Sequence, residues 1–189
     1  MNTPRQSSGF TLIELIIVIV VVAILATLTI VTYNGVQSRA RDTKIRAAAE
    51  HVQDGLEIYI AQTGRRPRGG WGATQTLTNG DCANGADGWF AKNAYGSGGC
   101  APEEVLVAAN LMPADMISSL PPNKKSGNTP LNVFMLYGCS STKIILMWYL
   151  ESPSAADTAS YDTAMLTPGC NSQNFRDGYG MQGAAVIDI

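Results

Sequence analysis

The feature that most constrains this chain is an apolar run at residues 10–31, in which Glu14 is the only charged residue. A helix of this length rises by about 1.5 Å per residue and can cross a hydrocarbon layer of roughly 30 Å. The run therefore predicts the transmembrane first half of a helix. The alternative is a cleaved secretory signal, since the wholly apolar block at 15–26 has a suitable length. A cut after Ala26 would leave Ile24 where a small residue is needed, so we favour the anchor.

Composition limits what else the chain can be. The protein has 189 residues, of which 46% are hydrophobic and 15% are charged, and its formal net charge is −2. These values fit one domain plus an anchor and exclude collagen-like or wholly disordered chains. The sequence has a single histidine, His51, and no Cys-x-x-Cys pair, which argues against zinc sites and histidine-dependent hydrolases. We expect no enzymatic activity, no cofactor and no metal.

Glu14 is the most informative residue of the apolar run. A carboxylate within a lipid-spanning segment costs on the order of 2–3 kcal/mol unless a partner neutralises it. Cleavage between Gly9 and Phe10 would create a free amine four residues before Glu14, and this amine could meet the carboxylate of a neighbouring chain. Alternatively, the carboxylate reaches the lipid headgroups or is protonated. Spacing alone leaves these possibilities open.

The residues around this position resemble a known motif. The prepilin cleavage motif of the type IV pilin and type II secretion pseudopilin superfamily is similar to the run Gly9, Phe10, Thr11, Leu12, Ile13, Glu14. The resemblance implies that residues 1–9 are a leader removed by a prepilin peptidase. It also implies that Phe10 becomes N-methylated and that Glu14 pairs with the N-terminus of a neighbouring subunit during assembly.

Residues 32–63 predict the amphipathic second half of the same helix. Apolar residues recur at steps of three and four from Ile45 to Ile60, and Gly64 with Pro67 ends the pattern. The pair Arg41-Asp42 and the run Leu56-Glu57-Ile58-Tyr59 resemble this part of pilin helices. Gly35 is the weakest position of the helix, because glycine has a low helix propensity. The helix could unwind there, or it could continue and tolerate the glycine.

Four cations closely follow the apolar run, namely Arg39, Arg41, Lys44 and Arg46. The positive-inside rule would place them in the cytoplasm. The cleavage motif instead implies a cytoplasmic leader, and the downstream cysteines suit an oxidising compartment. We therefore expect the part of the chain after the run to lie outside the cytoplasm.

Residues 64–189 predict a small globular head. Residues 64–130 read as a long loop region between helix and sheet, with a short helix at 103–110. Residues 131–189 would hold the sheet and a C-terminal cysteine loop, with a hairpin of strands 131–137 and 143–150 and an edge strand at 184–189. The expected fold is α+β and type IV pilin-like, with a long N-terminal helix packed on a small antiparallel sheet.

Four cysteines lie in this head, Cys82, Cys100, Cys139 and Cys170, and they permit three pairings. Proximity favours Cys82 with Cys100 and Cys139 with Cys170. Each closure would contribute roughly 3 kcal/mol on the chain-entropy model. The second pair resembles the C-terminal disulfide loop of many type IV pilins.

A basic segment follows the helix. Arg65, Arg66, Arg68 and Trp71 could contact phosphates and stack on a base of a nucleic acid. A solvated or subunit-contacting patch is the favoured interpretation, because the rest of the head is acidic. DNA is therefore a less favoured partner.

The resemblance implies a structural subunit of a type IV pilus or pilus-like filament. Its partners would be identical or related pilin subunits, a prepilin peptidase and the assembly machinery in the membrane. The precursor would reside in the cytoplasmic (inner) membrane, and the mature subunit in an extracellular or cell-surface pilus. The alternatives are a minor pilin or pseudopilin of a type II secretion or DNA-uptake system and, from another class, a membrane-tethered binding module.

Overall fold

The computed structural model describes residues 10–69, 77–78, 81–82, 88–92, 94, 100–170 and 175–189; the side chains of residues 29–32, 34 and 77–78 are not described. The chain divides into two compact units, Met1–Ser38 and Arg39–Ile189. We call the second of these the C-terminal unit. It contains the sheet, the shorter helices and the second half of the long helix.

The long helix α1 extends over Leu12–Thr63. It ends as predicted at Gly64, whose φ of +69° suits glycine and whose N–H donates to the Ile60 carbonyl at 2.8 Å. The helix continues through Gly35, so the structure favours the tolerated glycine over local unwinding. Among the described residues, no helix is sufficiently long and apolar to cross a membrane.

The main sheet is antiparallel and has the strand order β3-β4-β5-β6. Its strands are β3 (Gly88–Trp89), β4 (Phe134–Gly138), β5 (Lys143–Tyr149) and β6 (Met181–Asp188). The predicted hairpin is confirmed as β4 and β5, with Leu136 opposite Leu146. The predicted edge strand is confirmed as β6, which pairs with β5 and begins earlier than expected.

The first predicted strand begins later than its apolar pattern suggested. Residues Pro130–Asn132 form the 3₁₀ helix η2, so the strand starts at Phe134. The Thr129 side chain accepts a hydrogen bond from the Leu131 N–H, and Pro130 fills the first helical position, where its missing N–H costs nothing. A local capping signal thus outweighed the strand propensity of Leu131 and Val133.

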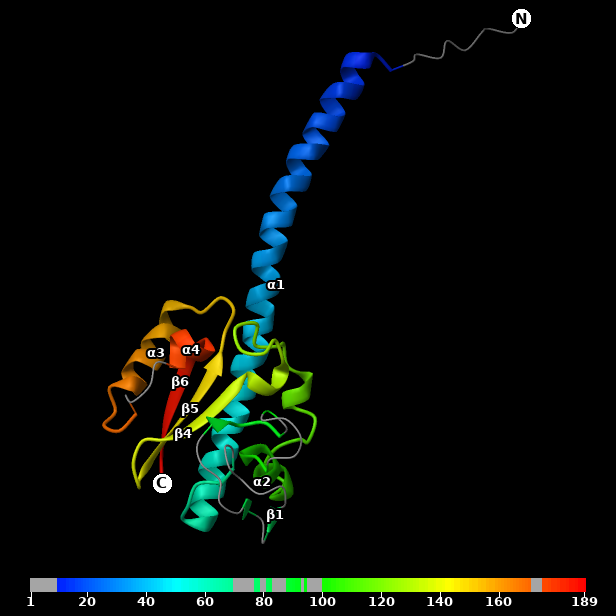
Figure 1. Cartoon of the computed structure of the whole chain (residues 1–189). Coiled ribbons are helices and arrows are strands. Elements are labelled where there is room, and N and C mark those ends of the chain that lie inside the picture. The colour runs from blue at the N-terminus through cyan, green and yellow to red at the C-terminus, as the bar shows by residue number, and fades with distance from the viewer. Residues whose placement is uncertain are drawn as a thin grey trace, which may run out of the picture. The chain divides into compact units, whose positions relative to one another are not determined.

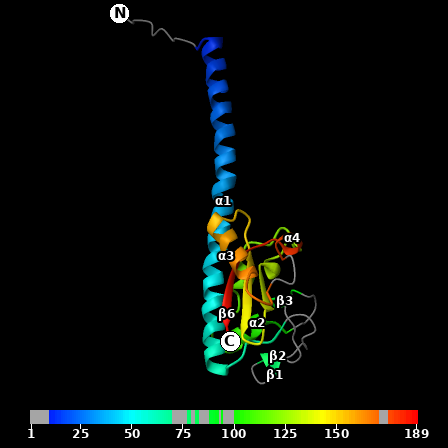
Figure 2. The same ribbon diagram turned by 90° about the vertical axis from the view of Figure 1, so that its left-hand side faces the viewer.

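Both faces of the sheet are covered. Alternate residues of β5 enter two different clusters: Ile144 and Leu146 pack with α1, whereas Ile145 and Met147 pack on the opposite face. Figure 2 shows the second half of α1 running alongside the sheet. This arrangement confirms the predicted α+β class, with a long N-terminal helix against a small antiparallel sheet.

Two helices on the second face were not predicted. These are α3 (Ala155–Met165) and α4 (Phe175–Tyr179), and α3 lies against β6 (Figure 1). The sequence of α3 consists mostly of small or polar residues, and only Tyr161 and Ala164 are buried, so it lacks a clear apolar stripe. Its start is marked by a capping box in which the Ser154 and Asp157 side chains each bond the other's backbone.

The region between α1 and the main sheet contains short elements. The strands β1 (Leu77–Thr78) and β2 (Asp81–Cys82) pair with each other. The predicted short helix corresponds to α2 (Pro102–Ala108), and a 3₁₀ helix, η1 (Ile117–Ser119), follows. Strand β3 also falls in the segment that we expected to be loop, and it adds a fourth strand to the sheet beside β4.

Candidate assembly site

The start of α1 carries the predicted assembly residue Glu14. Its Oε2 accepts hydrogen bonds from the Thr11 N–H at 2.8 Å and from the Thr11 hydroxyl at 2.6 Å. The Glu14 N–H in turn donates to the Thr11 hydroxyl at 3.3 Å. This reciprocal arrangement is a capping box, which satisfies backbone donors at a helix start. The carboxylate is therefore held by its own chain in the single subunit.

The role of Thr11 was missed by our sequence reasoning, although the signal was present. A threonine followed three residues later by glutamate, just before an apolar run, is the sequence pattern of a capping box. Phe10 is 88% exposed and lies directly before this turn. Gly9, the residue before the expected cleavage point, lies outside the described residues.

The apolar side chains after Glu14 are exposed within the N-terminal unit. Among them, Leu15 is 61% exposed and Leu25 is 57% exposed. A helix that is apolar on all sides requires cover from other molecules or from lipid. The side-chain arrangement thus combines a carboxylate, the exposed Phe10 just before it and a long uncovered apolar surface.

The second half of α1 is tied to the loop after β5 by a buried carboxylate. Asp42 is fully buried and accepts the backbone N–H groups of Glu151 and Ser152 at 2.8 and 2.7 Å. Beside it, Arg41 forms an ion pair with Glu151 at 2.8 Å. Lys124 also pairs with Glu151, and these two cations lower the pKa of that carboxyl, Lys124 having the larger effect. The Arg-Asp pair singled out in the sequence is therefore a structural clamp.

A second ion pair joins α1 to α3. The Arg46 guanidinium contacts both oxygens of Asp157 at 2.9 and 2.7 Å. This contact, with the hydrogen bonds of Ser154, holds the pKa of Asp157 to about 2. Two of the four cations that conflicted with the positive-inside rule, Arg41 and Arg46, thus have partners within the C-terminal unit.

The basic segment after α1 is partly neutralised. Arg65 forms an ion pair with Asp81, and the Arg68 backbone N–H donates to the same carboxylate at 2.8 Å. The Arg66 guanidinium lies against Gly138 at the end of β4, where a Cβ would come within 2.5 Å of it. Trp71 lies outside the described residues. The structure therefore brings Arg65 and Arg68 to an acid instead of forming a uniformly basic patch.

The four cysteines form two disulfides, Cys82–Cys100 and Cys139–Cys170, with Cα–Cα distances of 5.6 and 4.3 Å. These are the two pairings that proximity favours. Gly169 precedes the last cysteine with a φ of +87°, and a Cβ there would clash with the Cys139 carbonyl. The second disulfide thus depends on a glycine at this turn. In the described part of the chain, no group of ligands could hold a metal ion.

The comparisons with known proteins identify the N-terminal segment. A family described as prokaryotic N-terminal methylation motif matches residues 4–30. No curated protein and no solved structure shows a significant match to the chain. The matched segment includes Gly9, Phe10 and the Thr11–Glu14 capping box. Residues 4–30 therefore carry the prepilin-type methylation motif of type IV pilins and pseudopilins.

Proposed function

We propose that this protein is a structural subunit of a type IV pilus or pilus-like filament. The precursor is inserted in the cytoplasmic membrane through residues 10–31, cleaved after Gly9 by a prepilin peptidase and N-methylated at Phe10. Subunits then polymerise through the apolar half of α1. The observation that carries this proposal is the methylation motif at residues 4–30, with Glu14 in the first turn of an exposed apolar helix.

Electrostatics gives Glu14 its role in this proposal. A carboxylate that enters an apolar environment needs a positive partner, since attraction between opposite charges strengthens as the surrounding dielectric falls. Cleavage creates a cationic amine on Phe10. The Thr11 hydrogen bonds hold Glu14 in the isolated subunit, and the Phe10 amine of a neighbouring subunit replaces them as its partner during assembly.

The C-terminal unit acts in this proposal as a surface domain without catalysis. Its two disulfides are compatible with an exported, oxidising location. Its clamps to α1 keep the sheet attached to the helix that enters the filament. DNA is not its preferred partner, because Arg65 pairs with Asp81.

The proposal is tested by shearing cells, collecting surface filaments and measuring the N-terminal mass of the chain in the sheared and cell-bound fractions. An N-methylated Phe10 terminus abundant in filaments supports a main pilus subunit. The same terminus confined to the cell-bound fraction instead supports a minor pilin or a pseudopilin of a secretion or DNA-uptake system. An intact Met1, or a terminus near Thr27, contradicts processing at Gly9.

A further inference from the structure

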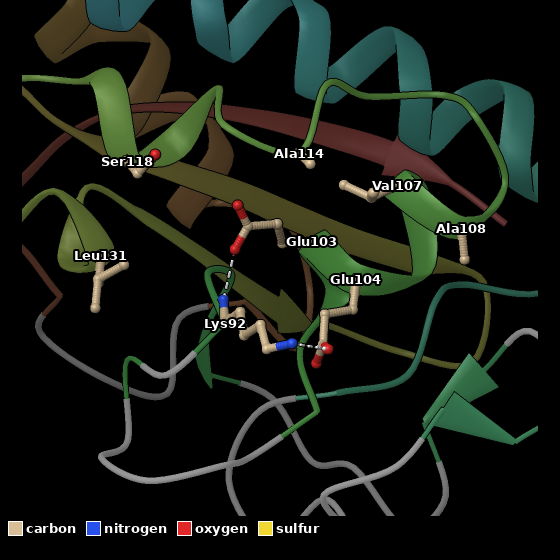
Figure 3. Close-up of a pocket in the computed structure, with 8 residues that line it drawn as sticks. All are labelled: Lys92, Glu103, Glu104, Val107, Ala108, Ala114, Ser118 and Leu131. Carbon is tan, nitrogen blue, oxygen red and sulfur yellow. Dashed lines mark hydrogen bonds and ion pairs between the residues drawn. The ribbon is translucent and has the colours of Figure 1, made fainter.

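A pocket of about 540 Å³ lies between α2, η1 and η2 in the C-terminal unit. Its size falls within the roughly 300–1,000 Å³ of small-molecule sites. Figure 3 shows its charged side chains, Lys92, Glu103 and Glu104, close together and between Leu131 and Val107. The apolar part of its lining is made by Val107, Ala108, Ala114 and Leu131.

Glu103 is the unusual member of this pocket. Glu103 is only 7% exposed, and this burial raises the pKa of its carboxyl group. One carboxylate oxygen, Oε2, accepts the Lys92 backbone N–H at 2.6 Å. Within the described part of the chain, its other oxygen has no hydrogen-bond donor, and in Figure 3 it points away from Lys92. A buried carboxylate with an open oxygen can accept a further donor.

The neighbouring charges favour a cationic donor. The Lys92 ammonium is engaged by Glu104 at 2.7 Å, so this pair is already neutral. Burial disfavours the charged form of Glu103, and a cation bound at its open oxygen beside the apolar walls would favour that form. A ligand that fits both features has a positive head and a short apolar body.

We propose that this pocket binds an alkylammonium group, whose charged head contacts Glu103 and whose carbon chain packs against Val107 and Leu131. Such a group occurs on small free amines and on lysine side chains of other polypeptides, which end in the same four-carbon ammonium chain. The site is independent of the filament function, because neither the cleavage motif nor Glu14 contributes to it.

The test uses the full-length, detergent-solubilised chain and follows the backbone amide signal of Lys92 by NMR during titration with n-butylammonium. The amide is bonded to Glu103, so it reports directly on that carboxylate. We expect saturable shifts with a midpoint in the millimolar range. The neutral analogue n-butanol should produce shifts at least tenfold weaker at equal concentration.

Two variants separate charge from shape. Glu103→Gln retains an acceptor for the Lys92 N–H and removes the negative charge, so the butylammonium midpoint should rise at least tenfold. Ala114→Leu places a larger side chain at an exposed lining residue, keeps both carboxylates, and should also weaken binding. Unchanged signals elsewhere in the spectrum check that each variant is folded.

The outcomes assign the source of the amine or reject the site. A lysine-containing peptide that shifts the same amide, while its acetyl-lysine version does not, identifies a polypeptide source. If butylammonium binds and the lysine-containing peptide does not, the source is a small free amine. Equal responses to butanol and butylammonium, undiminished binding to Glu103→Gln, or no saturable shift would each overturn the proposal.

Discussion

Two stretches of α1 are equally helical and differ in what covers their apolar side chains. In the N-terminal unit, Leu15, Val20 and Leu25 are each about half exposed or more, at 61%, 51% and 57%. In the C-terminal unit, Ile45, Val52 and Leu56 are at most 1% exposed. The second stretch buries one stripe against its own sheet, whereas the first is apolar on all sides. The difference teaches that one continuous helix can bury its apolar residues in two ways: against its own sheet, or against lipid or other molecules.

This comparison indicates that each stretch of α1 governs a different property of the protein. Stability of the C-terminal unit should depend on the buried stripe and its ion pairs. On the proposed function, the apolar stretch should instead govern insertion and polymerisation. Substitutions in one stretch should therefore leave the property of the other intact.

The largest expected effect is on assembly. Glu14→Gln removes the charge that the proposed function assigns to pairing with the Phe10 amine, so sheared filaments should fall at least tenfold. Glu50→Gln, at an exposed glutamate of the same helix, is the matched control and should assemble normally. Normal filament yield from Glu14→Gln would argue against the pairing role. Quantitative immunoblotting of the sheared fraction measures both variants.

The next effect is on folding. Leu56→Ala removes a fully buried side chain from the core between α1 and the sheet, and should lower the free energy of unfolding by about 2–5 kcal/mol. Leu25→Ala, in the exposed stretch, should change it by less than about 0.5 kcal/mol. Denaturant unfolding of the full chain in detergent, followed by tryptophan fluorescence, checks both values. Equal losses would break the comparison.

The clamp at Asp42 should have a smaller effect. Asp42→Ala leaves the N–H groups of Glu151 and Ser152 without their acceptor, which should cost about 2–3 kcal/mol of unfolding free energy. Asp42→Asn keeps one acceptor oxygen and should lose less. The same unfolding experiment compares the two variants, and a larger loss for the asparagine variant would contradict the assigned hydrogen bonds.

The smallest effect is a pH dependence from Asp157. Its pKa of about 2 in the folded state lies below the 3.8 of the free side chain, mainly because Arg46 binds the ionised form. Such a carboxyl contributes stability above its unfolded pKa and loses it as the pH falls through the folded pKa. We expect this contribution, on the order of 1–2 kcal/mol, to disappear between about pH 5 and pH 2.

Unfolding curves across that range should show a flatter acid limb for Asp157→Asn than for the parent chain. Asp115→Asn, at an exposed acid of the C-terminal unit, serves as the control and should keep the parent slope. An Asp157→Asn curve parallel to that of the parent chain would show that the Arg46 pair adds no pH-dependent stability.

Much of the fold was predictable because the signals were local. Spacing of apolar residues and the Gly64 turn defined α1, and two apolar runs defined β4 and β5. Helix α3 was missed because its residues are mostly small or polar and its burial comes from contact with the sheet. The unbroken apolar run of β5 could have revealed this cover, since a strand buried on both faces does not alternate.

The candidate site was only partly predictable from the sequence. The sequence identified Glu14, and the threonine three residues earlier signalled a capping box that our reasoning overlooked. The partners of Arg41, Arg46 and Arg65 could not be inferred, because they lie 110, 111 and 16 residues away along the chain. Glu103 carried no sequence signal at all, since its burial results from the packing of α2 beside Phe90 and Lys92.

The sequence by itself determined the apolar run, the methylation motif, the long helix and the hairpin, because these depend on residue spacing and short-range hydrogen bonds. Only the tertiary structure decided which carboxylates become buried, how the sheet is covered on its second face and where the pocket forms. Those features depend on contacts between residues far apart in the chain, where burial changes the free energy of a charge more than its local sequence does.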